Sequence, residues 1–141
     1  MPRRGSSVTF GKEMIDLAAT VIRDLEAPER KDLQERMLEA MLMMERHRGV
    51  PVDVEIAPDV ADADVSSPII HRLADALEKF IRTFPRHRDV GSAIWALGRL
   101  RDPRHADLFL AVTDPSSAYN EWARDQALCA LEDQGYEKKE A

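Results

Sequence analysis

The chain has 141 residues, of which 44% are hydrophobic, a formal net charge of -6 and one cysteine. This length suits a single domain with its own core, and one cysteine excludes a disulfide within the chain. The acidic balance disfavours a nucleic-acid ligand, because phosphate binding requires a local surplus of Lys and Arg. No long apolar run follows the basic, polar amino terminus, so we expect no signal peptide, no membrane contact and a cytoplasmic location.

The first third of the chain predicts a loose tail over residues 1–9 and a pair of helices over residues 10–49. Apolar residues recur at helical spacing in two runs separated by Pro28. The second run is rich in methionine, and we favour a buried position for it over an exposed Met-rich surface. Gly49 is expected to end that helix in the left-handed conformation.

Residues 50–66 carry five acids and no base, and we interpret them as an acidic linker. The segment begins with strand-like alternation, but one isolated strand cannot form a sheet. Asp59, Asp62 and Asp64 lack the spacing, the glycine and the distal glutamate of a calcium loop, so no metal site is expected there. These three acids are instead a candidate electrostatic surface for a basic protein partner.

The second half of the chain contains three pairs of residues that are typical of helix starts. Each pair places an N-cap residue before a proline: Ser67-Pro68, Asp102-Pro103 and Asp114-Pro115. A long apolar stripe follows the first pair and closes near Pro85. Three shorter helices are expected at about 89–101, 104–113 and 119–133.

An internal repeat with a 34-residue offset is the clearest pattern in the sequence. Ala93, Ala96 and Leu97 match Ala127, Ala130 and Leu131. A period of this length is typical of helical solenoids, in which small residues allow paired helices to approach closely and leucines fill the core.

Two short segments carry a resemblance to a known family: Ala-Leu-Gly-Arg-Leu at residues 96–100 and Asp-Pro-Arg at residues 102–104. Over about residues 69–136, the sequence resembles HEAT-like helical repeats of the phycobilisome-lyase type. The resemblance implies an all-α fold, a short α-α superhelix of antiparallel helix pairs with about six helices, in one domain over 10–141 with the repeats at 67–136. It also implies an ion pair between Asp114 and Arg124. Glu132 replaces the usual glycine, which makes the last repeat a cap.

No combination of residues in the sequence predicts catalysis, a cofactor or a metal. The four histidines are scattered, and no Gly-rich phosphate loop or nucleophile motif is present. Cys129 lies between apolar neighbours on a predicted helix, which favours a structural thiol. We therefore expect a protein that is not an enzyme.

Trp95 and Arg99 are the candidate partner-binding residues, because they are one helical turn apart and belong to the types most enriched in binding hot spots. The resemblance places Trp95 on the concave side, either exposed or filling a gap between repeats. Trp122 is expected to be buried or partly buried.

The expected function is therefore a protein-protein interaction module, and a narrower hypothesis is a bacterial immunity protein that neutralises a basic toxin domain. One alternative is a nucleic-acid-binding protein of the DNA-repair type, for which five arginines would supply the basic patch: Arg82, Arg86, Arg88, Arg99 and Arg101. Another is a regulatory subunit of an enzyme. Convergence of these arginines on one concavity would favour the nucleic-acid alternative.

Overall fold

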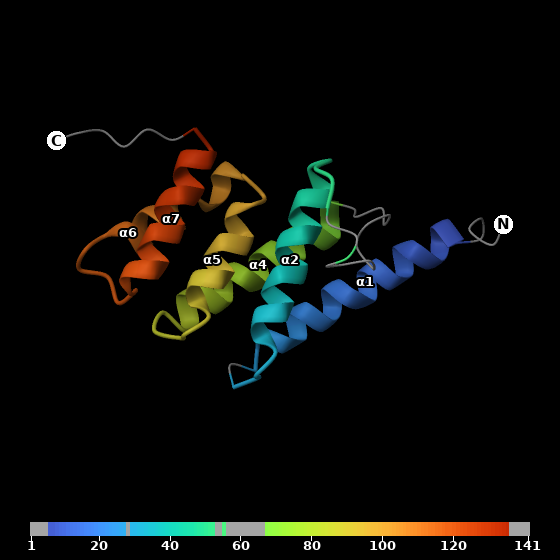
Figure 1. The fold of residues 1–141 in the computed structure, drawn as a ribbon, viewed down its shortest axis with the longest axis horizontal. Helices are drawn as coiled ribbons and strands as arrows, with labels where there is room; N and C mark the ends of the chain where they lie inside the picture. Colours follow the sequence, from blue (N-terminus) through green and yellow to red (C-terminus); the bar gives the residue numbers. More distant parts are fainter. Residues whose placement is uncertain (1–5, 28, 53–54, 56–66, 136–141) are drawn as a thin grey trace.

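The computed structural model describes residues 6–27, 29–52, 55 and 67–135. This part of the chain holds six α-helices and one short 3-10 helix, and it contains no strand (Figure 1). The predicted all-α fold class is confirmed. With the labels of Figure 1, the elements are α1 (Ser6–Asp24), α2 (Leu33–His47), α4 (Ser67–Thr83), α5 (Val90–Gly98), η1 (Pro103–His105), α6 (Ala106–Thr113) and α7 (Glu121–Asp133).

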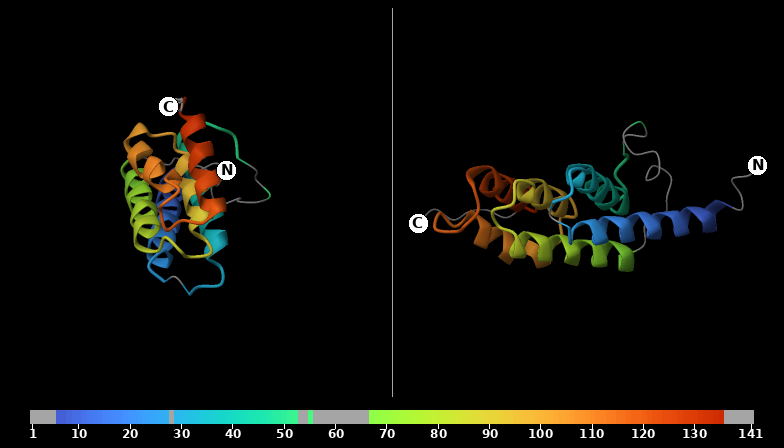
Figure 2. Two further views of the ribbon diagram at one scale, coloured as in Figure 1. Left: turned by 90° about the vertical axis from the view of Figure 1, so that its left-hand side faces the viewer. Right: turned by 90° about the horizontal axis from the view of Figure 1, so that it is seen from below.

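The helices form two layers, which Figure 2 shows most clearly in its right-hand view. One layer contains α1, α4 and α6, and the other contains α2, α5 and α7. Consecutive helices alternate between the layers, so that α1 packs on α2, α4 on α5 and α6 on α7. Within the second layer, α5 lies between α2 and α7 and packs extensively against both. The face formed by α2, α5 and α7 is called the α2/α5/α7 face below.

The matching positions of the 34-residue repeat are buried to the same degree in α5 and α7. Small residues and one leucine occupy these positions, where Leu97 is 1% exposed and Leu131 is 2% exposed. The alanines of both helices are also buried: Ala93, Ala96, Ala127 and Ala130. The repeat offset therefore predicted the buried side of both helices correctly.

The Met-rich helix α2 belongs to the core, as expected. Met37, Met43 and Met44 are fully buried, and Met41 is 9% exposed. At its end, Gly49 has a φ of 85° and the Val50 N–H donates to the carbonyl of Glu45 at 2.9 Å. Gly49 in the left-handed conformation, together with this hydrogen bond to the residue five positions before Val50, forms the glycine C-cap that the sequence predicted.

Two of the three predicted helix starts agree with the structure. α4 begins at Ser67, and the side chain of Asp102 accepts a hydrogen bond from the Arg104 N–H at the start of η1. The third prediction is wrong, because Asp114-Pro115 lies in a turn and α7 begins at Glu121. Asn120 is its N-cap and accepts from the Ala123 N–H at 2.7 Å. The Asp-Pro pair signalled a turn rather than a cap.

The predicted ion pair between Asp114 and Arg124 is also absent from the structure. The Asp114 carboxylate accepts from the backbone N–H and the hydroxyl of Ser116, both at 2.9 Å. Arg124 Nη1 donates to the carbonyl oxygen of Tyr119 at 2.7 Å. Both side chains therefore stabilise the α6–α7 connection locally instead of meeting.

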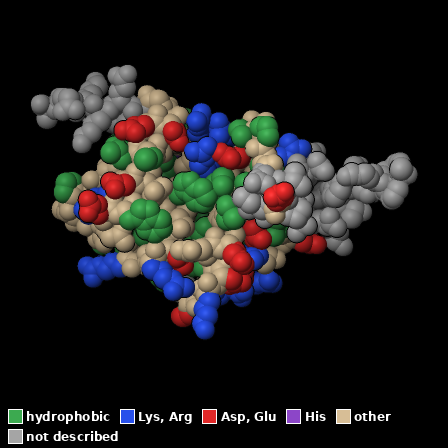
Figure 3. Space-filling view, in the orientation of Figure 1, with side chains coloured by type: hydrophobic (Ala, Val, Ile, Leu, Met, Phe, Trp, Pro, Cys, Tyr) green, Lys and Arg blue, Asp and Glu red, His purple; other side chains and the backbone are tan. Residues whose placement is uncertain are grey.

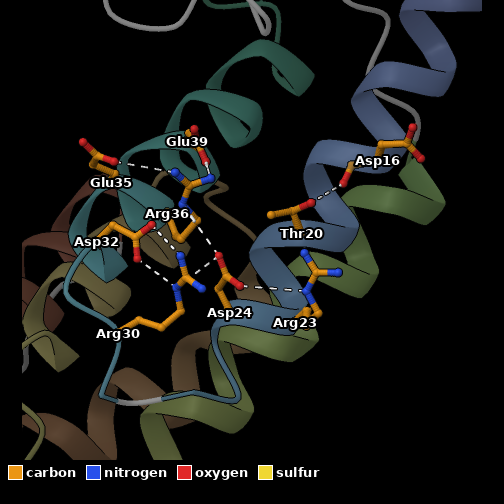
Figure 4. A network of polar contacts seen from close by, with 9 residues as sticks. All are labelled: Asp16, Thr20, Arg23, Asp24, Arg30, Asp32, Glu35, Arg36 and Glu39. Carbon is orange, nitrogen blue, oxygen red and sulfur yellow. Dashed lines mark hydrogen bonds and ion pairs between the residues drawn. The ribbon is translucent and has the colours of Figure 1, made fainter.

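A polar network joins the first two helices (Figure 4). Asp24, whose side chain is 7% exposed, lies within 4.0 Å of Arg23, Arg30 and Arg36. Arg36 also pairs with Glu39 at 2.8 Å. The Asp24 carboxylate thus interacts with arginines from α1, from the connecting turn and from α2, and these ion pairs hold α1 against α2.

The first helix is longer than the sequence predicted. It begins at Ser6, so residues 6–9 belong to α1 rather than to the tail. Most of the predicted acidic linker, including Asp59, Asp62 and Asp64, lies outside the described residues. Among the described helices, none combines the length and the apolar character needed to cross a bilayer.

Candidate functional site

Two glycines of α5 allow α7 to lie unusually close to it. A Cβ atom at Gly98 would stand 2.7 Å from the Cβ of Ala130, and one at Gly91 would stand 2.6 Å from Cε3 of the Trp122 ring. Carbon atoms do not approach so closely, so a larger residue at either position would force Ala130 or the Trp122 ring to shift. Trp95 lies between the two glycines in sequence and falls on the same side of the helix.

A groove of about 320 Å³ separates the exposed edges of α5 and α7. Its lining combines an indole, a guanidinium, a thiol and polar groups: Trp95, Gly98, Arg99, Gln126, Cys129 and Asp133. Figure 3 shows this face, where apolar side chains gather over α5 and the adjoining parts of α2 and α7. Lys and Arg side chains lie along its edges.

Arg99 is held at one end of the groove by acids from two other helices. Its Nε donates to Glu45 Oε2 of α2 at 2.8 Å, and its Nη1 donates to Asp133 Oδ2 of α7 at 3.3 Å. The side chain remains 30% exposed. A guanidinium fixed by two carboxylates presents its remaining N–H groups with little loss of side-chain entropy on binding.

The structure brings together two of the predicted site residues, since Trp95 and Arg99 line one groove. Trp95 is half-buried and packs against the core, so both interpretations of its position hold in part. Sequence reasoning missed Asp133 and Cys129 as members of the site. The repeat offset was the available signal, because they stand 34 residues after Arg99 and Trp95 respectively.

Two expectations about α7 require correction. Trp122 is 43% exposed, more than expected, and its ring lies over Gly91. Cys129 is exposed, whereas its apolar neighbours favoured a buried structural thiol. It lines the α5–α7 groove, and no described helix covers it there.

The five arginines of the nucleic-acid alternative do not converge on one concavity. Arg82 ends α4, and Arg86 and Arg88 lie in the connection before α5. Arg99 and Arg101 follow the other end of α5, after a helix of nine residues, which corresponds to about 13 Å. Arg82 is paired with Glu78 at 2.9 Å and Arg99 with Glu45.

The buried histidine of the chain has a structural partner. His105 is 3% exposed, and its Nδ1 is 2.8 Å from Glu78 Oε1 on α4. Burial acts to raise the pKa of Glu78, but hydrogen bonds from His105 and Arg82 outweigh it, so the pKa lies below its ordinary value. Within the described ranges, no group of three His, Cys, Asp or Glu side chains could hold a metal ion.

A second depression, of about 280 Å³, lies between α1 and α4 in the other layer. Its lining is mainly apolar and includes Ile22, Leu25, Phe80 and Phe84. It contains no counterpart of the tryptophan and the fixed arginine of the α5–α7 groove. The α5–α7 groove is therefore the better candidate site on side-chain chemistry.

Comparisons with known proteins supply no further identification. No family model matches the sequence, and searches of curated proteins and of solved structures found no significant match.

Proposed function

We propose that this chain is a protein-binding module whose α5–α7 groove receives a partner protein. The observation that carries the proposal is the half-buried Trp95 beside the doubly paired Arg99, both lining the groove at the centre of the α2/α5/α7 face. Tryptophan offers a large contact area with few rotatable bonds, and arginine offers a planar set of donors. Side chains of these types dominate the energetics of protein interfaces.

The immobilisation of both side chains supports this assignment. Trp95 packs against the hydrophobic core along one side, and Arg99 is held by Glu45 and Asp133. Residues that are already ordered lose less entropy when a partner binds, so more of the contact energy appears as affinity.

The separation of the arginines into two groups favours a protein partner over a nucleic acid, because a duplex needs a continuous basic track. The narrower hypothesis of a cytoplasmic immunity protein that binds a basic toxin rests on the net charge of -6 and the acids of residues 50–66. It stays a prediction, as does the HEAT-like family. The alternative of a regulatory enzyme subunit has no specific support.

The test begins with a partner found by pull-down and compares two single substitutions. Trp95→Ala should weaken binding about tenfold or more, mainly through faster dissociation, because a central aromatic contact is lost. Leu110→Ala is the matched control, since Leu110 is 37% exposed on α6 in the other layer and should leave binding unchanged.

A third variant tests the electrostatic candidate. Replacing Asp59, Asp62 and Asp64 together by Asn should slow association with a basic partner and flatten its salt dependence, with little change in dissociation. If Trp95→Ala folds normally by circular dichroism and binds the partner unchanged, the groove is not the binding site.

A further inference from the structure

Three arginines gather at one end of the α5–α7 groove. Arg48 is the C-cap residue of α2, Arg99 is the C-cap residue of α5, and Arg101 follows two residues later. Arg48 Nη1 donates to the carbonyl oxygen of Arg99 at 3.1 Å. Burial lowers the pKa of Arg48, and the positive charges of Arg101 and Arg99 lower it further. Arg48 therefore lies within electrostatic range of both Arg99 and Arg101.

The acids near this cluster do not balance it. Glu45 and Asp133 are both occupied by Arg99. Their effects on the pKa of Arg48 are smaller than those of the two arginines. Arg101 is exposed, and within the described residues its guanidinium makes no hydrogen bond or ion pair. This end of the groove therefore carries a positive charge that the described part of the chain leaves unneutralised.

The backbone of Arg101 adds an independent observation. Its φ is 57°, and it is the one described residue other than glycine with a positive φ. A side chain in this left-handed region costs free energy that glycine avoids, and helices commonly place glycine shortly after their ends for that reason. The two other positive-φ residues, Gly49 and Gly135, both follow helix ends. Strain that persists at a single arginine is typical of a functional position.

We propose that this cluster binds an acidic side chain of the partner protein, while an apolar side chain about one helical turn away packs against Trp95. This inference rests on the proposed function. Carboxylates match the planar donors of arginine, and the free charge adjoins the groove that Trp95 lines. A partner that is basic overall can still carry this one acid. Exposed acids on α7, Asp125 and Glu132, would repel an extended polyanion such as nucleic acid.

The test uses a displayed library of random peptides selected on the full chain. We expect the selected peptides to share an acidic residue near an apolar one. Arg101→Gly should weaken their binding about tenfold or more, while the melting temperature stays unchanged or rises because glycine relieves the positive φ. Arg101→Lys should lose less affinity. Arg86→Gln is the matched control, because Arg86 is an exposed arginine at the other end of α5.

The outcomes separate this inference from the proposed function. Peptides that require Trp95 but lack an acid, or that tolerate Arg101→Gly, overturn the acid-binding cluster and leave the groove as a binding site. Enrichment of no peptide, or of peptides that bind equally well to Trp95→Ala, overturns both. Displacement of the peptides by a DNA duplex at about 0.15 M salt assigns the arginines to phosphates and also overturns the inference.

Discussion

Helices α5 and α7 contain the same short pattern in two different surroundings. α5 packs between α2 and α7, whereas α7 packs on α5 and α6 and has no described helix on its far side. The alanines and the leucine at matching positions are buried in both. The positions around them differ, since Gly98 of α5 corresponds to the exposed Glu132 of α7. A repeat thus conserves its buried side, while the neighbouring helices decide the rest.

The groove also shows that matching positions can carry different side chains, because residues at matching positions of the repeat form its two walls. Trp95 and Cys129 both line it, and Arg99 pairs with Asp133. Each of these pairs is separated by 34 residues. The 34-residue offset therefore relates side chains that line the same groove from two different helices.

The largest expected effect comes from the buried leucines. Leu97→Ala and Leu131→Ala should each lower the free energy of unfolding by about 2–5 kcal/mol, as for other buried leucines. Leu97→Ala should lower the free energy of unfolding more than Leu131→Ala, because α5 is enclosed on both sides and its surroundings can relax less. Denaturant unfolding monitored by circular dichroism measures both. A loss below about 0.5 kcal/mol at both positions would mean that the repeat register is wrong.

A smaller effect is expected at the positions where the two helices differ. Gly98→Ala should lower the free energy of unfolding by about 1–2 kcal/mol, because overpacking against Ala130 costs more than the better helix propensity returns. Glu132→Ala should change it by less than about 0.5 kcal/mol.

A double variant sharpens this comparison. Adding Ala130→Gly to Gly98→Ala removes the clash, so the combined loss should be less than the sum of the two single losses. Additive losses, or stabilisation by Gly98→Ala alone, would contradict the close approach of α5 and α7.

The smallest expected effect is a change in the stability of the protein at acid pH, caused by a residue in the layer formed by α1, α4 and α6. Because the pKa of Glu78 is lowered in the folded protein, its stabilising contribution is complete above the unfolded value near 4.5 and is lost as the pH falls through the folded value. Glu78→Gln should therefore reduce the fall in melting temperature between about pH 6 and about pH 3. Asp75→Asn, one turn earlier on α4, is the control. An equal acid sensitivity in wild type and Glu78→Gln would refute this role.

Much of the fold could be predicted from the sequence because helical periodicity is a local property. Apolar residues three and four positions apart define the buried side of each helix, and Gly49 and Asp102 define helix ends within a few residues. The 34-residue offset identified the equivalent buried positions in α5 and α7. The four-residue spacing of Trp95 and Arg99 placed them on one side of their helix.

The sequence did not show which of those sides are covered by another helix. Only the tertiary structure decided this. Cys129 is exposed because none of the described helices covers its position on α7, although its sequence neighbours are apolar. Glu45 becomes a partner of Arg99 across 54 residues of sequence. Each of these depends on how neighbouring helices are placed, and a pattern that repeats every three or four residues contains no information about that placement.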